Sequence, residues 1–176
     1  MSSTDKLNLN FQNQTRSAID AAMVNAVVMA TLKVCRVMGD VEVLFKRLVA
    51  QKDYSPCGDI SALIGIAGDT GEGVVAISLS LKAANLLVGR LLRVDPRSVD
   101  SYDRKDGVGE LVNMIAGSTK IELARLTDAS YNLSLPSLIV GNNHEIISRP
   151  KDSPYLVMVF ELEGQEFIVQ MAYKPK

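Results

Sequence analysis

The hydrophobic positions near the start of the chain follow no single face. A stretch rich in Ala, Val and Met runs from about Ser17 to Val37 and is apolar nearly all round. A helix of this kind is usually covered on more than one side. The residues before it are polar and rich in Asn and Gln. We therefore expect residues 1–14 to be a polar, loosely held N-terminal tail and residues 15–176 to form a single domain.

Further along the chain the apolar residues alternate with a period of two, which predicts strands. The segments with this pattern are 41–49, a hairpin over 60–80, the proline-containing stretch 131–141, and a closing hairpin with arms 155–162 and 166–174. The arms of the closing hairpin are strongly apolar. We expect this hairpin to lie at an exposed edge of the sheet, where it would pair with a second chain.

Two helices are predicted between these strands. The first spans 81–92, with Ser80 as its N-cap, and the second spans 106–126. Helices and strands do not alternate one by one, so a doubly wound parallel sheet is not indicated. The pattern predicts an α+β fold with an antiparallel or mixed sheet, long helices packed on it, and the element order αβββααβββ.

The helix at 106–126 has two distinct faces when residues are placed at about 100° per position. The broad face that should meet the core contains Val108, Leu111, Val112, Ile115, Thr119 and Leu126. A narrow stripe opposite contains Asp106, Glu110, Asn113, Gly117 and Lys120. Such a stripe is usually a solvated surface, and periodicity alone shows only where the side chains point.

Glu110 and Asn113 are nevertheless a chemically useful pair. A carboxylate can bind a lysine ammonium on a partner. A carboxamide has both a donor and an acceptor, so it can hold a water molecule in one orientation. Gly117 follows one turn later, although a glycine inside a helix costs about 1 kcal/mol relative to alanine. Its presence is compatible with close approach of another molecule to the backbone.

Composition narrows the possible functions. The chain has 19 basic and 20 acidic residues and a formal net charge of −1, so nothing indicates a nucleic-acid surface. The most hydrophobic stretch, residues 21–32, is shorter than the roughly 20 residues that span a bilayer. No signal peptide is apparent, and we expect a cytoplasmic protein that does not contact the membrane.

The residues that bind transition metals are few. Cys35 and Cys57 are the only cysteines and His144 is the only histidine, so a zinc site is not expected and both thiols should be reduced. His144 is a candidate general base. Because no Asp or nucleophile is evidently paired with it, a role in a loop or in packing is the better interpretation.

The spacing of the helix stripe resembles the signature of the CheC/CheX/FliY family of chemotaxis phosphatases. The matching residues are Asp106, Glu110 and Asn113, followed after twenty-two residues by Pro136. The segment LPSLIVGNNHEI (135–146) is also similar to the strand and turn that follow this helix in CheX proteins. The signature occurs once here, as in CheX, whereas CheC-type proteins carry two copies. We therefore expect one site per chain.

The resemblance implies a phosphatase that hydrolyses the phospho-aspartate of a CheY-like response regulator. Glu110 would pair with the regulator's lysine, and Asn113 would position a water for in-line attack. Mg²⁺ would come with the regulator, and this chain would bind no cofactor. Asp106 would contact the partner or favour the helix N-terminus through the dipole. Gly117 and Pro136 would support the site, Pro136 at a strand edge or bulge.

Two further expectations follow from the resemblance. CheX-like proteins join their sheets across a two-fold axis, so we expect a homodimer whose interface is built from strands. The alternative function is a non-catalytic module of the same fold that docks a response regulator or a flagellar switch component. The Glu110–Asn113 pair distinguishes the two functions, because docking alone would not require Asn113.

Overall fold

The computed structural model describes residues 3–50, 58–146 and 155–176. Its helices are α1 (Ser3–Gly39), α2 (Leu81–Leu92) and α3 (Ser101–Thr127), with a short 3₁₀ helix, η2 (Pro96–Ser98), between the last two. Its strands are β1 (Leu44–Ala50), β2 (Gly58–Gly68), β3 (Gly71–Leu79), β4 (Tyr131–Leu133), β5 (Ser137–His144), β6 (Tyr155–Leu162) and β7 (Gln165–Pro175).

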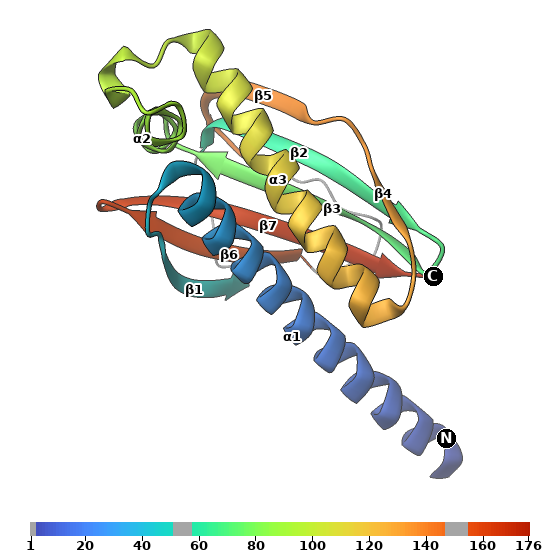
Figure 1. Cartoon of the computed structure of the whole chain (residues 1–176). Helices are drawn as coiled ribbons and strands as arrows, with labels where there is room; N and C mark the ends of the chain where they lie inside the picture. The colour runs from blue at the N-terminus through green and yellow to red at the C-terminus, as the bar shows by residue number, and fades with distance from the viewer. Residues whose placement is uncertain (1–2, 51–57, 147–154) are drawn as a thin grey trace.

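The described strands form one seven-stranded antiparallel sheet in the order β1-β6-β7-β3-β2-β4, and β5 also pairs with β2. The helices lie on one face of this sheet, with α1 and α3 running side by side across it (Figure 1). The core lies between the two layers. Side chains such as Ile64 and Met171 from the sheet pack there with Val27 and Ile115 from the helices. The predicted α+β fold is confirmed.

The helices differ from expectation at their starts. α1 begins at Ser3, and its N-terminal half extends past the sheet (Figure 1). The helical region of 3–14 was expected as a tail, and whether it lies outside the domain stays a prediction. α3 begins at Ser101 because Asp100 is its N-cap. The Asp100 carboxylate accepts hydrogen bonds from the backbone N–H groups of Tyr102 (2.7 Å) and Asp103 (2.8 Å).

The stretch predicted as one strand over 131–141 forms two strands, so four strands rather than three follow α3. Both β4 and β5 pair with β2, and Pro136 lies in the gap between them. A proline has no N–H to donate to a neighbouring strand, which explains the interruption. Ser134 secures the gap, since its Oγ accepts from the Gly65 N–H at 2.9 Å and its N–H donates to the Gly65 carbonyl at 2.9 Å.

The closing hairpin is present as β6 and β7, but it does not lie at an edge. Glu163 and Gly164 form its turn with φ values of 49° and 74°, which is typical of a type I′ hairpin. The hairpin lies between β1 and β3 in the sheet. Its apolar residues Val157, Val159, Phe167, Val169 and Met171 are all buried. The prediction of an exposed terminal edge is therefore wrong, and the edge strands of the described sheet are β1 on one side and β4 and β5 on the other.

The apolar part of α1 is longer than the sequence pattern indicated. Ala21–Gly39 is long and apolar enough to cross a membrane by length and composition alone. However, Met23, Val27 and Ala30 from this segment are buried in the hydrophobic core. Packing against α3 and the sheet therefore accounts for the buried side of this segment, whereas Met29 and Val37 are 63% and 68% exposed.

Candidate functional site

α3 presents the predicted stripe on its outer side. Asp106, Glu110 and Asn113 are exposed, and Gly117 and Lys120 are half-buried. The opposite face is packed into the core, where Val108, Leu111, Val112, Ile115 and Thr119 have no exposed surface. Leu126 departs from the prediction, since it is 51% exposed. It lines an open groove between α1 and α3, and the neighbouring Leu123 is buried in the core instead.

The side-chain carboxylate of Glu110 and the carboxamide of Asn113 do not stabilise the described part of the fold through polar contacts. Within the described residues, neither side chain makes a hydrogen bond or an ion pair. Residues three positions apart on a helix have Cβ atoms about 5–6 Å apart on the same side. The carboxylate and the carboxamide thus lie next to each other with all their hydrogen-bonding capacity available to another molecule.

The N-terminal half of α3, which carries this pair, is held firmly against α2. A Cβ at Gly107 would lie only 2.7 Å from Cγ1 of Val88, so the close contact between the helices requires glycine there. Arg104 Nε donates a hydrogen bond of 2.6 Å to Asn85 Oδ1 on α2. These contacts fix the orientation of α3 and therefore the direction in which Glu110 and Asn113 point.

Gly117 has a different environment from Gly107. No atom of a packed neighbour lies within 4 Å of the position that its Cβ would occupy. Internal packing therefore gives no reason for glycine, although glycine weakens the helix by about 1 kcal/mol relative to alanine. The open backbone one turn beyond Asn113 agrees with the close approach of another molecule that the sequence indicated.

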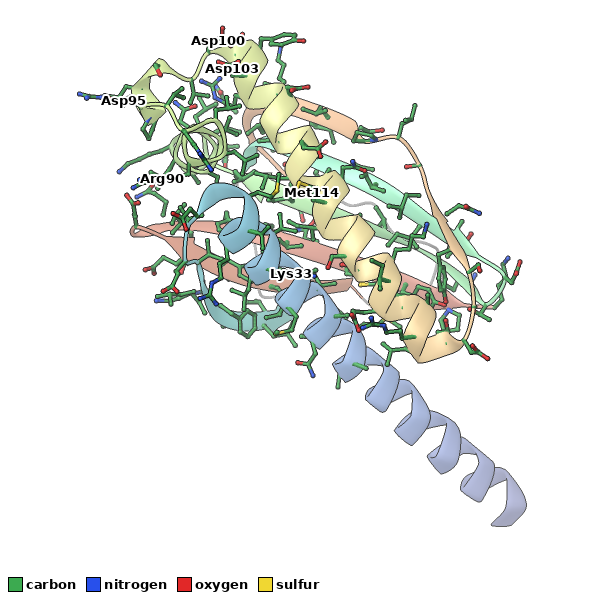
Figure 2. The ribbon with its side chains drawn as sticks, viewed as in Figure 1. Lys33, Arg90, Asp95, Asp100, Asp103 and Met114 are labelled. Atoms are coloured by element: carbon green, nitrogen blue, oxygen red, sulfur yellow. The ribbon has the colours of Figure 1, made fainter. Side chains whose placement is uncertain are left out.

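Asp106 does not serve the helix N-terminus. Because α3 begins at Ser101, Asp106 lies beyond the first turn, where the helix dipole has little effect. Asp100 and Asp103 occupy the N-terminal end instead (Figure 2). The dipole interpretation of Asp106 is therefore wrong. The residue is exposed one turn before Glu110 and extends the acidic part of the stripe.

The segment around Pro136 lies beside this helix. Pro136 is exposed at the sheet edge, as expected for a proline near a strand. The position of a Cβ on Gly109 would be 3.4 Å from Leu138 Cδ1, so β5 contacts the flank of α3. The sequence indicated the helix stripe, but it did not show that exposed apolar side chains of 135–140 adjoin it. The missed signal was the absence of Asp, Glu, Lys and Arg from residues 129–144.

His144 is engaged within the fold. Its Nδ1 lies 2.8 Å from the Gly141 carbonyl and its Nε2 lies 2.8 Å from Ser61 Oγ. Since a carbonyl only accepts, the neutral ring carries its proton on Nδ1, and Nε2 accepts from Ser61. The hydroxyls of Ser61 and Ser78 share a further hydrogen bond of 2.8 Å. His144 lies on β5, Ser61 on β2 and Ser78 on β3, so these hydrogen bonds join the end of β5 to both of the other strands. Ser61 is fully buried, which shields them from water.

The described residues offer little for a metal ion. In the ranges that the structure covers, no three His, Cys, Asp or Glu side chains are grouped closely enough to hold one. Burial raises the pKa of the Cys35 thiol to about 12, so this side chain remains protonated at neutral pH. Cys57 lies outside the described residues. That the chain binds no cofactor stays a prediction.

The fold and the stripe define a domain with helices on one face of an antiparallel sheet and an acid–amide pair on an exposed helix. A sequence model described as chemotaxis phosphatase CheX matches residues 60–161. The chain therefore belongs to the CheX family of chemotaxis phosphatases. The matched region contains Asp106, Glu110, Asn113, Gly117 and Pro136. No curated protein sequence matches the chain significantly.

Solved structures of related proteins agree with the family. A chemotaxis protein CheX from Desulfovibrio desulfuricans is 26% identical, with a TM-score of 0.76 over 86% of this chain and 99% of that chain. A putative chemotaxis protein from Desulfovibrio vulgaris Hildenborough is 28% identical, with a TM-score of 0.74 over 86% and 96%. CheX from Borrelia burgdorferi, solved in a CheX–CheY–BeF₃–Mg²⁺ complex, has the same fold, with 24% identity and a TM-score of 0.71 over 86% and 97%.

Proposed function

We propose that this protein hydrolyses the phospho-aspartate of a CheY-like response regulator in the cytoplasm. The observation that carries the proposal is the placement of Glu110 and Asn113 on the exposed side of α3, with no partner among the described residues. Family membership supports phosphatase activity in general. The Borrelia burgdorferi relative was solved with CheY, BeF₃ and Mg²⁺, which supports a regulator as the partner and Mg²⁺ that arrives with it.

In this mechanism the regulator supplies the phosphorylated aspartate, a lysine and the bound Mg²⁺. The Glu110 carboxylate forms a charge-assisted hydrogen bond with the lysine and orients the two proteins. The Asn113 carboxamide oxygen accepts a hydrogen bond from a water molecule and so aligns the water oxygen with the phosphorus. The water oxygen bonds to phosphorus as the bond to the aspartate oxygen breaks, so the aspartate leaves as a carboxylate and the phosphate keeps the protons of the water. Catalysis then consists of positioning, and no residue of this chain is covalently modified.

The direct test is to mix the protein with a phosphorylated CheY-like regulator and Mg²⁺ and to follow the loss of phosphate. We expect the wild-type protein to accelerate the loss and Asn113→Ala to abolish the acceleration. Asn25→Ala is the matched control, because Asn25 is also an exposed asparagine on a helix. Full activity in Asn113→Ala would refute the mechanism. Binding of the regulator without faster hydrolysis by the wild-type protein would favour the non-catalytic docking module instead.

We also propose a homodimer that forms through a sheet edge. The closing hairpin is interior to the sheet, so the available edges among the described strands are β1 on one side and β4 and β5 on the other. Both present exposed apolar residues, for example Leu48 on β1 and Ile139 on β5, and neither edge belongs to the Glu110–Asn113 stripe. Light scattering of Leu48→Lys and Ile139→Lys tests the two edges separately. A monomeric wild-type protein at micromolar concentration would contradict the dimer.

A further inference from the structure

An uncharged apolar strip lies along the edge of the sheet beside α3. It consists of Leu135, Leu138 and Val140, which are 86%, 39% and 56% exposed. Leu138 and Val140 are two residues apart, so they share a face of β5. That face is the helix side of the sheet, because they pair with Ala62 and Ile60, whose side chains are in the core. Exposed apolar side chains grouped along one edge in this way are a candidate interaction site.

The opposite edge of the sheet, β1, carries charged side chains that this strip lacks. On β1, Lys46 and Arg47 form ion pairs with Glu161 (2.9 Å) and Glu166 (2.8 Å). On β1 these charged side chains lie among exposed apolar residues such as Leu44 and Leu48. Residues 129–144 contain no Asp, Glu, Lys or Arg. The exposed, uncharged composition of the β5 edge is therefore typical of a surface that binds another protein.

The location of the strip indicates which protein covers it. Leu138 contacts the flank of α3 at Gly109, and Asn113 lies one turn further along that flank. A protein–protein contact of standard size buries about 800 Å² on each partner, which is far more than Glu110 and Asn113 provide. The opposite flank of α3, around Met114, faces α1 and is partly buried (Figure 2). A partner seated on the pair needs further contact area, and the strip provides apolar area directly beside the pair.

The charged residues near the strip also favour a response regulator as the binding partner. Asp103 and Asp106 lie on the N-terminal half of α3 together with Glu110, just after the N-cap Asp100, and outnumber the exposed Lys105 beside them. This acidic group is complementary to the lysine and Mg²⁺ around a regulator's phospho-aspartate. The uncharged strip adjoins it and supplies apolar contact area. Protein interfaces combine such an apolar region with a polar, charged surround.

On this basis, and resting on the proposed function, we propose that Leu135, Leu138 and Val140 are the apolar docking surface for the receiver domain of the phosphorylated regulator. The strip contributes affinity, whereas Asn113 performs the chemistry. Removing apolar area from the strip should therefore weaken binding and leave the rate at saturating regulator unchanged.

The test uses Leu135→Ser and Leu138→Ser in the full chain, with a CheY-like receiver domain activated by BeF₃⁻ and Mg²⁺ as the binding probe. We expect each variant to raise Kd, and KM with the phosphorylated regulator, about tenfold without changing kcat. Leu92→Ser is the matched control, because Leu92 is 47% exposed at the end of α2, and its constants should match the wild type. If Leu138→Ser fails to fold, the more exposed Leu135 carries the test.

The outcomes separate this proposal from the proposed function. Unchanged Kd and KM in both strip variants, with an active wild-type protein, would overturn the docking surface and leave the phosphatase intact. A wild-type protein that neither binds nor hydrolyses would overturn both. If the strip variants turn a dimer into a monomer while regulator binding by the monomer equals that of the wild type, the strip is an interface between two copies and the proposal is wrong.

Discussion

The two faces of α3 are built from neighbouring residues of one helix, yet one face packs into the hydrophobic core and the other faces solvent. On the buried face, side chains such as Leu111 and Ile115 have no exposed surface and hold the helix to the sheet. On the outer face, Glu110 and Asn113 are exposed and make no polar contact with the described remainder of the chain. Substitutions on the first face should change stability, and substitutions on the second should change activity, with little overlap.

The largest difference between the effect on activity and the effect on stability is expected at Asn113. Asn113→Ala should lower kcat by about 100-fold or more, which is typical of the loss of one well-placed hydrogen-bonding group in a catalytic site. The midpoint of thermal unfolding should stay within about 1 °C of the wild type, because no described residue depends on this side chain. Phosphate release and circular dichroism measure the two quantities. A large fall in thermal stability would show that Asn113 has a structural role.

The reverse pattern is expected at Ile115, two residues away. Ile115→Ala removes a fully buried side chain and should lower the free energy of unfolding by about 2–5 kcal/mol. The activity of the fraction that remains folded should be close to that of the wild type. Urea unfolding followed by assay below the transition measures both. Loss of activity in fully folded Ile115→Ala protein would mean that the two faces are coupled.

Glu110 should affect regulator affinity more than stability. Glu110→Gln keeps the shape and removes the charge, so KM should rise roughly tenfold through loss of a charge-assisted hydrogen bond. Added salt should weaken binding by the wild type more than binding by the variant, because screening acts on the charge that the variant lacks. Glu122→Gln on the same helix is the control, since Glu122 pairs with Arg125 instead (2.9 Å). Equal KM values for the two variants would argue against a specific role for Glu110.

The smallest and most diagnostic effect is expected at Gly117. Gly117→Ala should stabilise the protein by about 0.5–1 kcal/mol, because helix propensity improves and no neighbour is crowded. It should at the same time weaken regulator binding. Gly107→Ala is the contrasting control: its Cβ would lie 2.7 Å from Val88 Cγ1, so it should destabilise. A stabilised Gly117→Ala protein with wild-type affinity would show that nothing approaches the backbone there.

Local features of the fold were predictable because they depend on residues close in sequence. α2 was predicted at 81–92 with Ser80 as its cap, and in the structure it spans Leu81–Leu92 with the Ser80 side chain accepting from the Ala83 N–H at 3.1 Å. The closing hairpin was located correctly as well. The start of α3 was not predicted, because the residues before 106 are polar and have no helical pattern of apolar residues. The structure shows that α3 begins at Ser101 and that Asp100 is its N-cap.

The two faces of α3 follow from the sequence alone, since a period of 3.6 residues assigns each side chain to a side whatever packs around it. It also contained the spacing of Glu110, Asn113 and Pro136 that resembles the signature of the CheC/CheX/FliY family. The interior position of the apolar closing hairpin, and the contact of the uncharged edge strand β5 with α3, became apparent only from the assembled sheet. Those relationships are set by pairing between strands far apart in the chain. Alternation within one strand shows that it has a buried face, but the neighbour that each edge receives depends on how the whole sheet is assembled.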